Sequence, residues 1–241
     1  MDEARNGANF MQMPKLDLVL DPRISDLKQS HLFPSGLADH DHEFAQRASD
    51  ALRGMYNTTS EYCHAVALIG FSDLQSGLQG SGFPGFNRPR LVYSGWTNLG
   101  ARTATFAAHD FDKLSVELRA ALRKVPSWWG LSDKDAFKTA QAKFRTMFPD
   151  ARKIRDASAH PETYVGNRNR TDQNGMFGGV FIAPGVKQTM LQNVLYNGVL
   201  TTTFDGAVIA SPVHLASAIE LRSIMALYAS AVSKFARQDS Y

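Results

Sequence analysis

A long apolar stripe in the middle of the chain most restricts the folds that this sequence can adopt. Between Trp96 and Val125, apolar side chains recur every three or four residues, which is the repeat of one face of an α-helix. The residue before a proline avoids helical geometry, so we expect the helix to end before Pro126. Roughly 25–30 residues at a rise of 1.5 Å form a rod of about 40 Å, which suits a helical bundle rather than the crossover helix of an α/β unit. The stripe consists of Trp96, Leu99, Thr103, Phe106, Asp110, Leu114, Leu118, Ala121, Leu122 and Val125.

A second helical pattern precedes this stripe. It is predicted to begin near Asp39 or Asp41, because either carboxylate can cap the free amides of a first turn, and to continue through Ile69. Residues 76–90 are rich in glycine and proline, so they are expected to form the loop between the two helices. This loop does not spell a phosphate-binding motif, because no Gly-Lys-Ser/Thr follows the glycines.

A third helical pattern follows the stripe and contains a proline. It is predicted to begin at Ser132 or Asp133, and its apolar residues continue up to Pro149. Since proline breaks or restarts a helix, we expect a kink there, or a new helical segment over residues 149–160 that Pro161 closes.

The period then changes from helical to extended. Asn197-Gly198 and Asp205-Gly206 each lie between β-branched or aromatic residues, and both dipeptides readily adopt the positive φ angles of two-residue hairpin turns. These turns predict a three-stranded antiparallel meander over about residues 190–210, to which Val180–Ile182 is expected to add.

The final pattern is again helical. It is predicted to begin with Ser211 as its cap and Pro212 in its first turn, and Arg222 interrupts its apolar face. The expected fold class is therefore mainly α, an antiparallel helical bundle with a small antiparallel β-meander inserted before the last helix. The residues expected to be buried together in its core are Phe106, Leu114, Leu118, Phe144, Ile154, Leu221 and Met225.

The composition is that of a folded domain with an arm. Of the 241 residues, 44% are hydrophobic and 20% are charged, which is enough apolar material for a core. We expect an N-terminal extension over residues 1–38, which lacks a sustained period, and one domain over residues 39–241. Cys63 is the only cysteine, which excludes an internal disulfide and favours a reducing, cytoplasmic location. No signal peptide or apolar run of about 18 residues is recognisable, and the net charge of +3 permits an anionic partner without requiring one.

One short segment has the residue types of a catalytic site. It reads Arg155-Asp156-Ala157-Ser158-Ala159-His160, so an arginine and a carboxylate precede a histidine at a predicted helix end. A second arginine–histidine pair, Arg102 and His109, has no acidic residue after the arginine. The first segment also has basic neighbours that suit a phosphate backbone, namely Arg145, Arg152, Lys153, Arg168 and Arg170.

The segment resembles the signature of the HEPN family, in which an arginine, often followed by a polar residue, precedes a histidine by a few positions. The expected order of elements is also similar to that family, with long antiparallel helices before the motif, a turn after it and a final closing helix. The resemblance covers about residues 40–237, although only Arg155–His160 match a motif. It implies a metal-independent endoribonuclease that cleaves single-stranded RNA without a cofactor, with two copies of the motif paired across a homodimer.

The chemistry of these side chains suits RNA cleavage. A histidine with an ordinary pKa of about 6.5 exchanges protons at neutral pH, so His160 is expected to help a 2′-hydroxyl attack the adjacent phosphate. Arg155 is expected to hold phosphate oxygens and to stabilise the charge of the transition state. Asp156 lies four residues before His160, on the same helix face, and is expected to orient the imidazole. The expected nucleic-acid contacts are Arg152, Lys153, Arg168 and Arg170.

A structural interpretation of the same residues leaves a second function open. Arg155 and Asp156 would then form surface ion pairs, and His160 would cap the helix C-terminus. In that case the chain is a non-catalytic helical interaction module that binds a protein partner or a nucleotide. Its contact surfaces would be Trp128–Trp129 and the meander.

Other candidate sites are weaker. Cys63 and His64 are adjacent and point about 100° apart on a helix, so they do not form a nucleophile–base pair, and Cys63 is expected to be a buried thiol. His40 and His42 have no accompanying ligand motif, so no metal site is expected. Trp128–Trp129 are expected to close the end of the bundle rather than to stack on bases.

Overall fold

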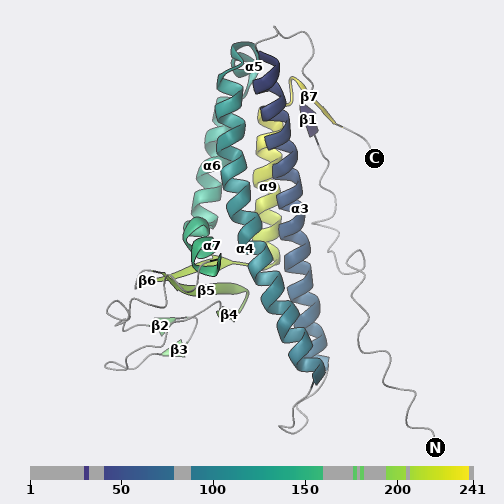
Figure 1. The fold of residues 1–241 in the computed structure, drawn as a ribbon, viewed down its shortest axis with the longest axis vertical. Coiled ribbons are helices and arrows are strands. Elements are labelled where there is room, and N and C mark those ends of the chain that lie inside the picture. Colours follow the sequence, from purple (N-terminus) through teal and green to yellow (C-terminus); the bar gives the residue numbers. More distant parts are fainter. Residues whose placement is uncertain are drawn as a thin grey trace, which may run out of the picture.

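Long helices packed side by side dominate the computed structural model, which describes residues 30–32, 41–78, 88–159, 176–177, 180–181, 194–204 and 207–238 (Figure 1). These residues form six helices and three small antiparallel sheets. The three-stranded sheet lies beside one end of the bundle and is followed by the helix α9 (Figure 1). The predicted mainly helical class, with a small meander before the last helix, is confirmed.

The helices α3 (His42–Leu78) and α4 (Arg88–Arg123) form the longest antiparallel pair. Their backbones approach closely at Gly100, where an added Cβ would lie only 2.8 Å from the carbonyl oxygen of Ala65. A Cβ added at Gly54 would lie 2.9 Å from Leu114 Cδ1. Both helices also bury many small side chains, namely Ala45, Ala48, Ala51, Ala101, Ala104, Ala107 and Ala108.

The buried face of α4 is therefore rotated from the predicted stripe. Leu99 is 58% exposed, and Phe106 and Leu114 are only partly buried. The physical reason is that alanine and glycine let two helix backbones come close, so they take the contact that the larger side chains were predicted to make. The other predicted core residues are buried as expected, namely Leu118, Phe144, Ile154, Leu221 and Met225.

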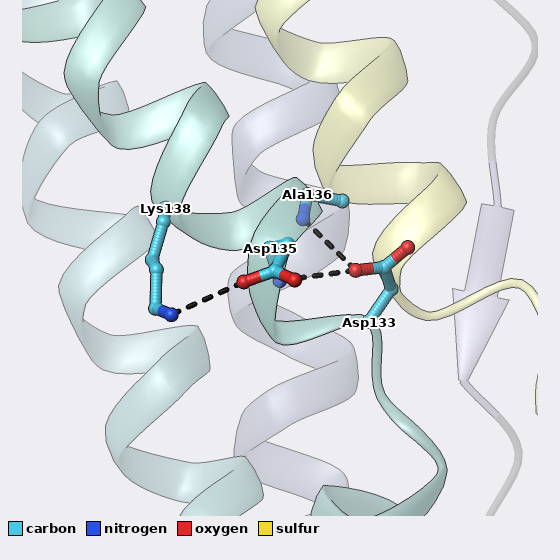
Figure 2. A network of polar contacts seen from close by, with 4 residues as sticks. All are labelled: Asp133, Asp135, Ala136 and Lys138. Carbon is cyan, nitrogen blue, oxygen red and sulfur yellow. Dashed lines mark hydrogen bonds and ion pairs between the residues drawn. The ribbon is translucent and has the colours of Figure 1, made fainter.

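The predicted start of the third helical pattern is confirmed at α6 (Lys134–Met147). Figure 2 shows the cap: one carboxylate oxygen of Asp133 accepts hydrogen bonds from the backbone N–H groups of Asp135 and Ala136. Lys138 Nζ donates to Asp135 Oδ1 at 3.1 Å in the same turn. Between α4 and α6 a short helix, α5 (Pro126–Leu131), was not predicted.

Pro149 separates two helical segments, as expected. The helix α6 ends with Phe148 as its C-cap, and α7 (Ala151–Ala159) begins two residues after the proline. Ile154 in α7 is fully buried, and α7 packs against α4 and against the three-stranded sheet. The predicted continuation to His160 and Pro161 lies outside the described residues.

The meander is confirmed as the sheet β4 (Val194–Tyr196), β5 (Val199–Phe204) and β6 (Ala207–Pro212), in that order. The predicted first turn has positive φ angles of 47° at Asn197 and 70° at Gly198. Residues 205–206 of the second turn lie outside the described residues, although Phe204 and Ala207 on either side of them are paired.

Val180–Ile182 was expected to add to the meander, and this is wrong for Val180 and Phe181, which are the residues of this segment that the structure describes. The strand β3 (Val180–Phe181) pairs with β2 (Met176–Phe177) in a separate two-stranded sheet. Pairing with a strand only two residues away in sequence closes a much shorter loop, which costs less chain entropy than pairing with the meander.

The predicted start of the last helix is also wrong. Ser211 and Pro212 belong to β6, where they are paired with Leu200 and Val199. The helix α9 (Leu215–Ala231) begins later, with His214 as its N-cap. The ladder of β5 and β6 continues through the two residues that were expected to open the helix, so pairing with β5 overrides the Ser-Pro signal.

One further pairing joins distant parts of the chain. The strand β1 (Ser30–Leu32) is antiparallel to β7 (Ala236–Gln238), next to the start of α3 (Figure 1). Ser49 Oγ in α3 donates to the carbonyl oxygen of Leu32 at 2.8 Å. The rest of the predicted N-terminal extension, residues 1–29 and 33–38, lies outside the described residues. No helix in the described ranges combines the length and apolar character needed to cross a membrane.

Candidate functional site

The segment singled out in the sequence is only partly described. Arg155 and Asp156 lie on α7, and both side chains are partly exposed. The described residues do not include His160, Arg168 or Arg170, so the geometry between the arginine and the histidine is not part of the structure that we describe.

Asp156 is surrounded by arginines from its own helix. Arg155 Nη1 donates to Asp156 Oδ1 at 3.2 Å, and Arg152 Nε lies 3.9 Å from Asp156 Oδ2. Lys153 Nζ donates to Asp150 Oδ1 at 2.9 Å. The cations of α7 that were expected to contact RNA are thus each matched by a carboxylate nearby. Exposed ion pairs of this kind contribute little to stability, but they do reduce the local positive charge.

A cavity of about 810 Å³ lies elsewhere, between the last turns of α3, the Asn197–Gly198 turn and the start of α9. This volume falls in the range of about 300–1,000 Å³ that is typical of ligand sites. Its polar side chains are few: Asp73, Gln75, Asn197 and His214. The apolar side chains of its wall are Val66, Ala67, Ile69, Phe71, Leu74, Val213 and Leu215.

The meander turn is held in place at the edge of this cavity. The backbone N–H of Val213 donates to the carbonyl oxygen of Gly198 at 2.7 Å. A Cβ added at Gly198 would lie 2.7 Å from His214 Cβ, and the φ of Gly198 is +70°. Both its conformation and its surroundings therefore favour glycine at this position.

His214 fixes the other edge of the cavity through a reciprocal cap of α9. Its Nδ1 accepts from the backbone N–H of Ser217 at 3.1 Å, and Ser217 Oγ accepts from the backbone N–H of His214 at 3.0 Å. Since Nδ1 is an acceptor, the neutral ring carries its proton on Nε2, which is then a hydrogen-bond donor.

Tyr62 ties this junction to α3. Its hydroxyl donates to the carbonyl oxygen of Pro212 at 2.5 Å and forms a hydrogen bond with Ser217 Oγ at 2.8 Å. Burial raises the pKa of the Tyr62 phenol, with the Ser217 hydrogen bond opposing the shift. The tyrosine therefore stays neutral and keeps its role as a donor over the physiological pH range.

Among the described residues that line this cavity, Asp73 alone carries a carboxylate. Partial burial raises its pKa, and Thr97 Oγ1, which donates to Asp73 Oδ1 at 3.5 Å, opposes the shift. An aromatic cluster borders the same end of the helix pair, because Phe71 in the cavity wall stacks on Trp96 with ring centroids 6.4 Å apart. The described residues thus form a mostly apolar wall that includes the acid Asp73 and the imidazole of His214.

Other residues considered in the sequence are packed inside the fold. Trp128 is buried and stacks on Phe235 at 4.9 Å, and Trp129 stacks on Phe137 at 6.1 Å, which agrees with the prediction that the pair closes the end of the bundle. Cys63 is buried, and burial raises the pKa of its thiol to about 11. Within the described ranges, no three histidine, cysteine, aspartate or glutamate side chains gather as metal ligands would.

Sequence reasoning pointed to the meander as a contact surface but missed Asp73 and His214. A local signal existed only for His214, because a side chain that accepts a hydrogen bond three residues before a serine is the arrangement of a reciprocal helix cap. The position of Asp73 in the cavity wall depends on the packing of distant segments. In comparisons with known proteins, no family model, no curated protein and no solved structure matches this chain.

Proposed function

We propose that this chain is a non-catalytic helical interaction module, and that the cavity between α3, the Asn197–Gly198 turn and α9 binds apolar side chains of a partner protein. The observation that carries the proposal is the apolar cavity itself, together with large exposed side chains next to it. Leu74 in its wall is 62% exposed, and Tyr196, directly before the turn, is 48% exposed. Exposed apolar surface around a concave site is typical of protein-binding surfaces.

The lining also indicates the chemistry of the partner. Apolar side chains fill most of the wall, so the partner should present large aliphatic or aromatic residues. Asp73 places a carboxyl group in this wall, which favours a lysine or arginine beside those residues. We therefore expect an apolar segment with a flanking basic residue to bind in this cavity.

Two glycine substitutions test this site with a matched control. Gly70 lines the cavity, and a Cβ added there meets no described atom within 4 Å, so Gly70→Phe should fill the cavity without disturbing the fold. Gly95 in α4 is equally open and does not line the cavity, so Gly95→Phe adds the same side chain to a helix elsewhere.

The experiment is a selection of peptides from a random library on the wild-type chain, followed by affinity measurements on both variants. Selected peptides should be apolar with a basic residue, should lose at least about tenfold in affinity for Gly70→Phe, and should bind Gly95→Phe like wild type. Peptides that bind both variants equally, or the absence of any enrichment, would show that the cavity is not the binding site.

A metal-independent endoribonuclease is the second candidate, and one observation favours it. Although paired with Asp156, the Arg155 side chain is 40% exposed and lies beside Arg152, which is 83% exposed, so a phosphate can reach both. Under this proposal the wild type cleaves single-stranded RNA in the presence of EDTA, and Arg155→Ala and His160→Ala each abolish cleavage. His109→Ala is the control and should cleave like wild type. Intact RNA after incubation with the wild type would eliminate this candidate.

A further inference from the structure

Side chains of α4 and α6 form a seam along the surface of the bundle, where these two helices lie side by side (Figure 1). Arg119 Nη1 in α4 donates to Gln141 Oε1 in α6, and the buried rings of Phe111 and Phe144 stack with centroids 5.3 Å apart. Residues three, four or seven positions from Arg119 and Gln141 lie on the same faces of their helices, because one turn contains 3.6 residues. The seam therefore consists of two helix faces that can be read from the sequence.

The charges on these two faces are mainly positive. Two carboxylates, Asp112 and Asp135, lie on or beside the faces, but the cations outnumber them. Along α6 the cations extend from Lys134 to Arg145, which is about three turns or about 16 Å. The cations of the seam are Arg119, Arg123, Lys134, Lys138 and Arg145.

Two of these arginines, one from each helix, act on the same buried group. Burial raises the pKa of the Tyr228 phenol, and a hydrogen bond with Ser115 opposes the shift. The positive charges of Arg119 and Arg145 also oppose it, so both guanidinium groups lie near this hydroxyl. They are therefore close enough to bind neighbouring carboxylates of one partner.

The cations of the seam are available to a partner. Lys138 Nζ donates to Asp135 Oδ1 at 3.1 Å, but the two side chains are 78% and 89% exposed (Figure 2). Such a pair contributes little and can be exchanged for an intermolecular one. Arg123, Lys134 and Arg145 are exposed, and they form no ion pair within the part of the chain that the structure describes.

Exposed apolar side chains accompany these charges. Val116, which is 49% exposed, lies three residues before Arg119 on the same face of α4. Leu131, which is 48% exposed, ends α5 three residues before Lys134. Single exposed apolar residues are ordinary, but here each lies next to a cation. A partner that matches both features carries carboxylates and aliphatic side chains together.

We infer that this seam is a docking surface for an acidic segment of another protein, with aliphatic side chains among its carboxylates. Carboxylates complement the cations of the seam, and an arginine can hold a carboxylate through two parallel hydrogen bonds. Val116 and Leu131 provide the contacts for the aliphatic side chains. The inference does not rest on the proposed function, because no residue of the seam lines the cavity that we propose as the binding site.

A nucleic acid is also a polyanion, but the seam suits it less well. Single strands bind through bases that stack on free aromatic faces, in addition to their phosphates. Trp129 lies among these cations, and its ring is already in use: Arg123 Cζ is 5.3 Å and Lys134 Nζ is 5.5 Å from its centroid. The same ring stacks on Phe137 at 6.1 Å. The exposed side chains next to the cations are aliphatic, so a protein segment fits better.

The probes for this surface are labelled helical peptides of about 20 residues, about 30 Å long, with glutamate and leucine on one face in several arrangements. Fluorescence anisotropy measures their binding to the full chain. At least one peptide should bind with a dissociation constant below about 100 μM, and the binding should weaken as salt is added. A peptide with glutamine in place of every glutamate should not bind.

Two double variants locate the site at equal net charge. Lys138→Gln with Arg145→Gln removes two cations from the seam and should raise the dissociation constant at least about tenfold. Lys113→Gln with Lys124→Gln removes two exposed cations that lie about 120–140° from Arg119 around α4, so peptide binding should stay within about twofold of wild type. All four side chains are exposed, so both variants should keep the wild-type stability in a urea titration.

A third variant separates a protein partner from a nucleic acid. Val116→Ser should weaken the binding of the glutamate–leucine peptide at least about threefold and leave the binding of polyglutamate unchanged, because only the first buries an aliphatic contact. Three results would overturn the inference: no binding of any peptide at about 100 μM, an equal loss in the two double variants, or tighter binding of polyuridylate at the seam with no effect of Val116→Ser. The last of these would identify a nucleic acid as the partner.

Discussion

Replacing Gly100 with alanine should destabilise the fold, although alanine is the better helix former. In the interior of a helix, this change by itself stabilises by about 1 kcal/mol. At Gly100, however, the new Cβ would lie 2.8 Å from the carbonyl oxygen of Ala65 and 2.9 Å from Ile69 Cγ1. The first of these atoms belongs to the backbone and cannot rotate away, so α3 and α4 must separate. Overpacking of this kind costs about 1–3 kcal/mol, which leaves the variant less stable than wild type by up to about 2 kcal/mol.

Gly95 provides the comparison within the same helix. A Cβ added there meets no described atom within 4 Å, so Gly95→Ala should keep the full gain of about 1 kcal/mol. One chemical change in one helix is thus expected to shift the free energy of unfolding in opposite directions. Urea titration measures both shifts, and an unchanged slope confirms that the unfolded states are comparable. If both variants were stabilised equally, the close approach of α3 and α4 at Gly100 would be refuted.

Three further predictions concern the core and two groups with shifted pKa values. Leu118→Ala should lower the free energy of unfolding by about 2–5 kcal/mol in a urea titration, because Leu118 is fully buried; a loss below about 1 kcal/mol would mean that this face of α4 is not in the core. Between its ordinary pKa of 9.0 and the folded value of about 11, the Cys63 thiol keeps its proton only in the folded state, so the free energy of unfolding should fall as pH rises through this range. In Cys63→Ala, the free energy of unfolding should decline less steeply over the same range. Asp73 has a raised pKa, so the folded state favours its protonated form, and stability falls as pH rises through that pKa. Asp73→Asn should therefore be at least as stable as wild type at pH 7, while it binds basic peptides more weakly. A marked loss of stability in this variant would contradict the prediction.

Those parts of the fold that depend on local chemistry were predictable from the sequence. The Asn197–Gly198 turn has the positive φ angles that its two residues accept most readily, and Asp133 caps α6 through hydrogen bonds within three residues. Pro149 separates α6 from α7 for an equally local reason. In each case the deciding atoms are close in the chain, so no knowledge of the tertiary structure was needed.

Those parts that depend on distant contacts were not predictable. The rotation of α4 is decided by which side chains let α3 approach, and a count of apolar positions gives Leu99 more weight than Gly100. Ser211 has the sequence signature of a helix cap, but it is paired with Leu200 in the sheet. The candidate cavity joins residues of α3 to Asn197 and His214, more than a hundred positions later, so no local pattern could have shown Asp73 in its wall.

The position of α9 in the chain has a consequence for folding during synthesis. The helices α3 and α4 are neighbours in sequence and can pair as soon as both have left the ribosome, because only a short connection has to close. The helix α9, which buries Leu221, Ile224, Met225 and Tyr228 almost completely against earlier segments, is made after all of them. Until it emerges, the nascent chain exposes the apolar surface that α9 later covers, and during this interval a chaperone or an identical nascent chain on a neighbouring ribosome competes for that surface.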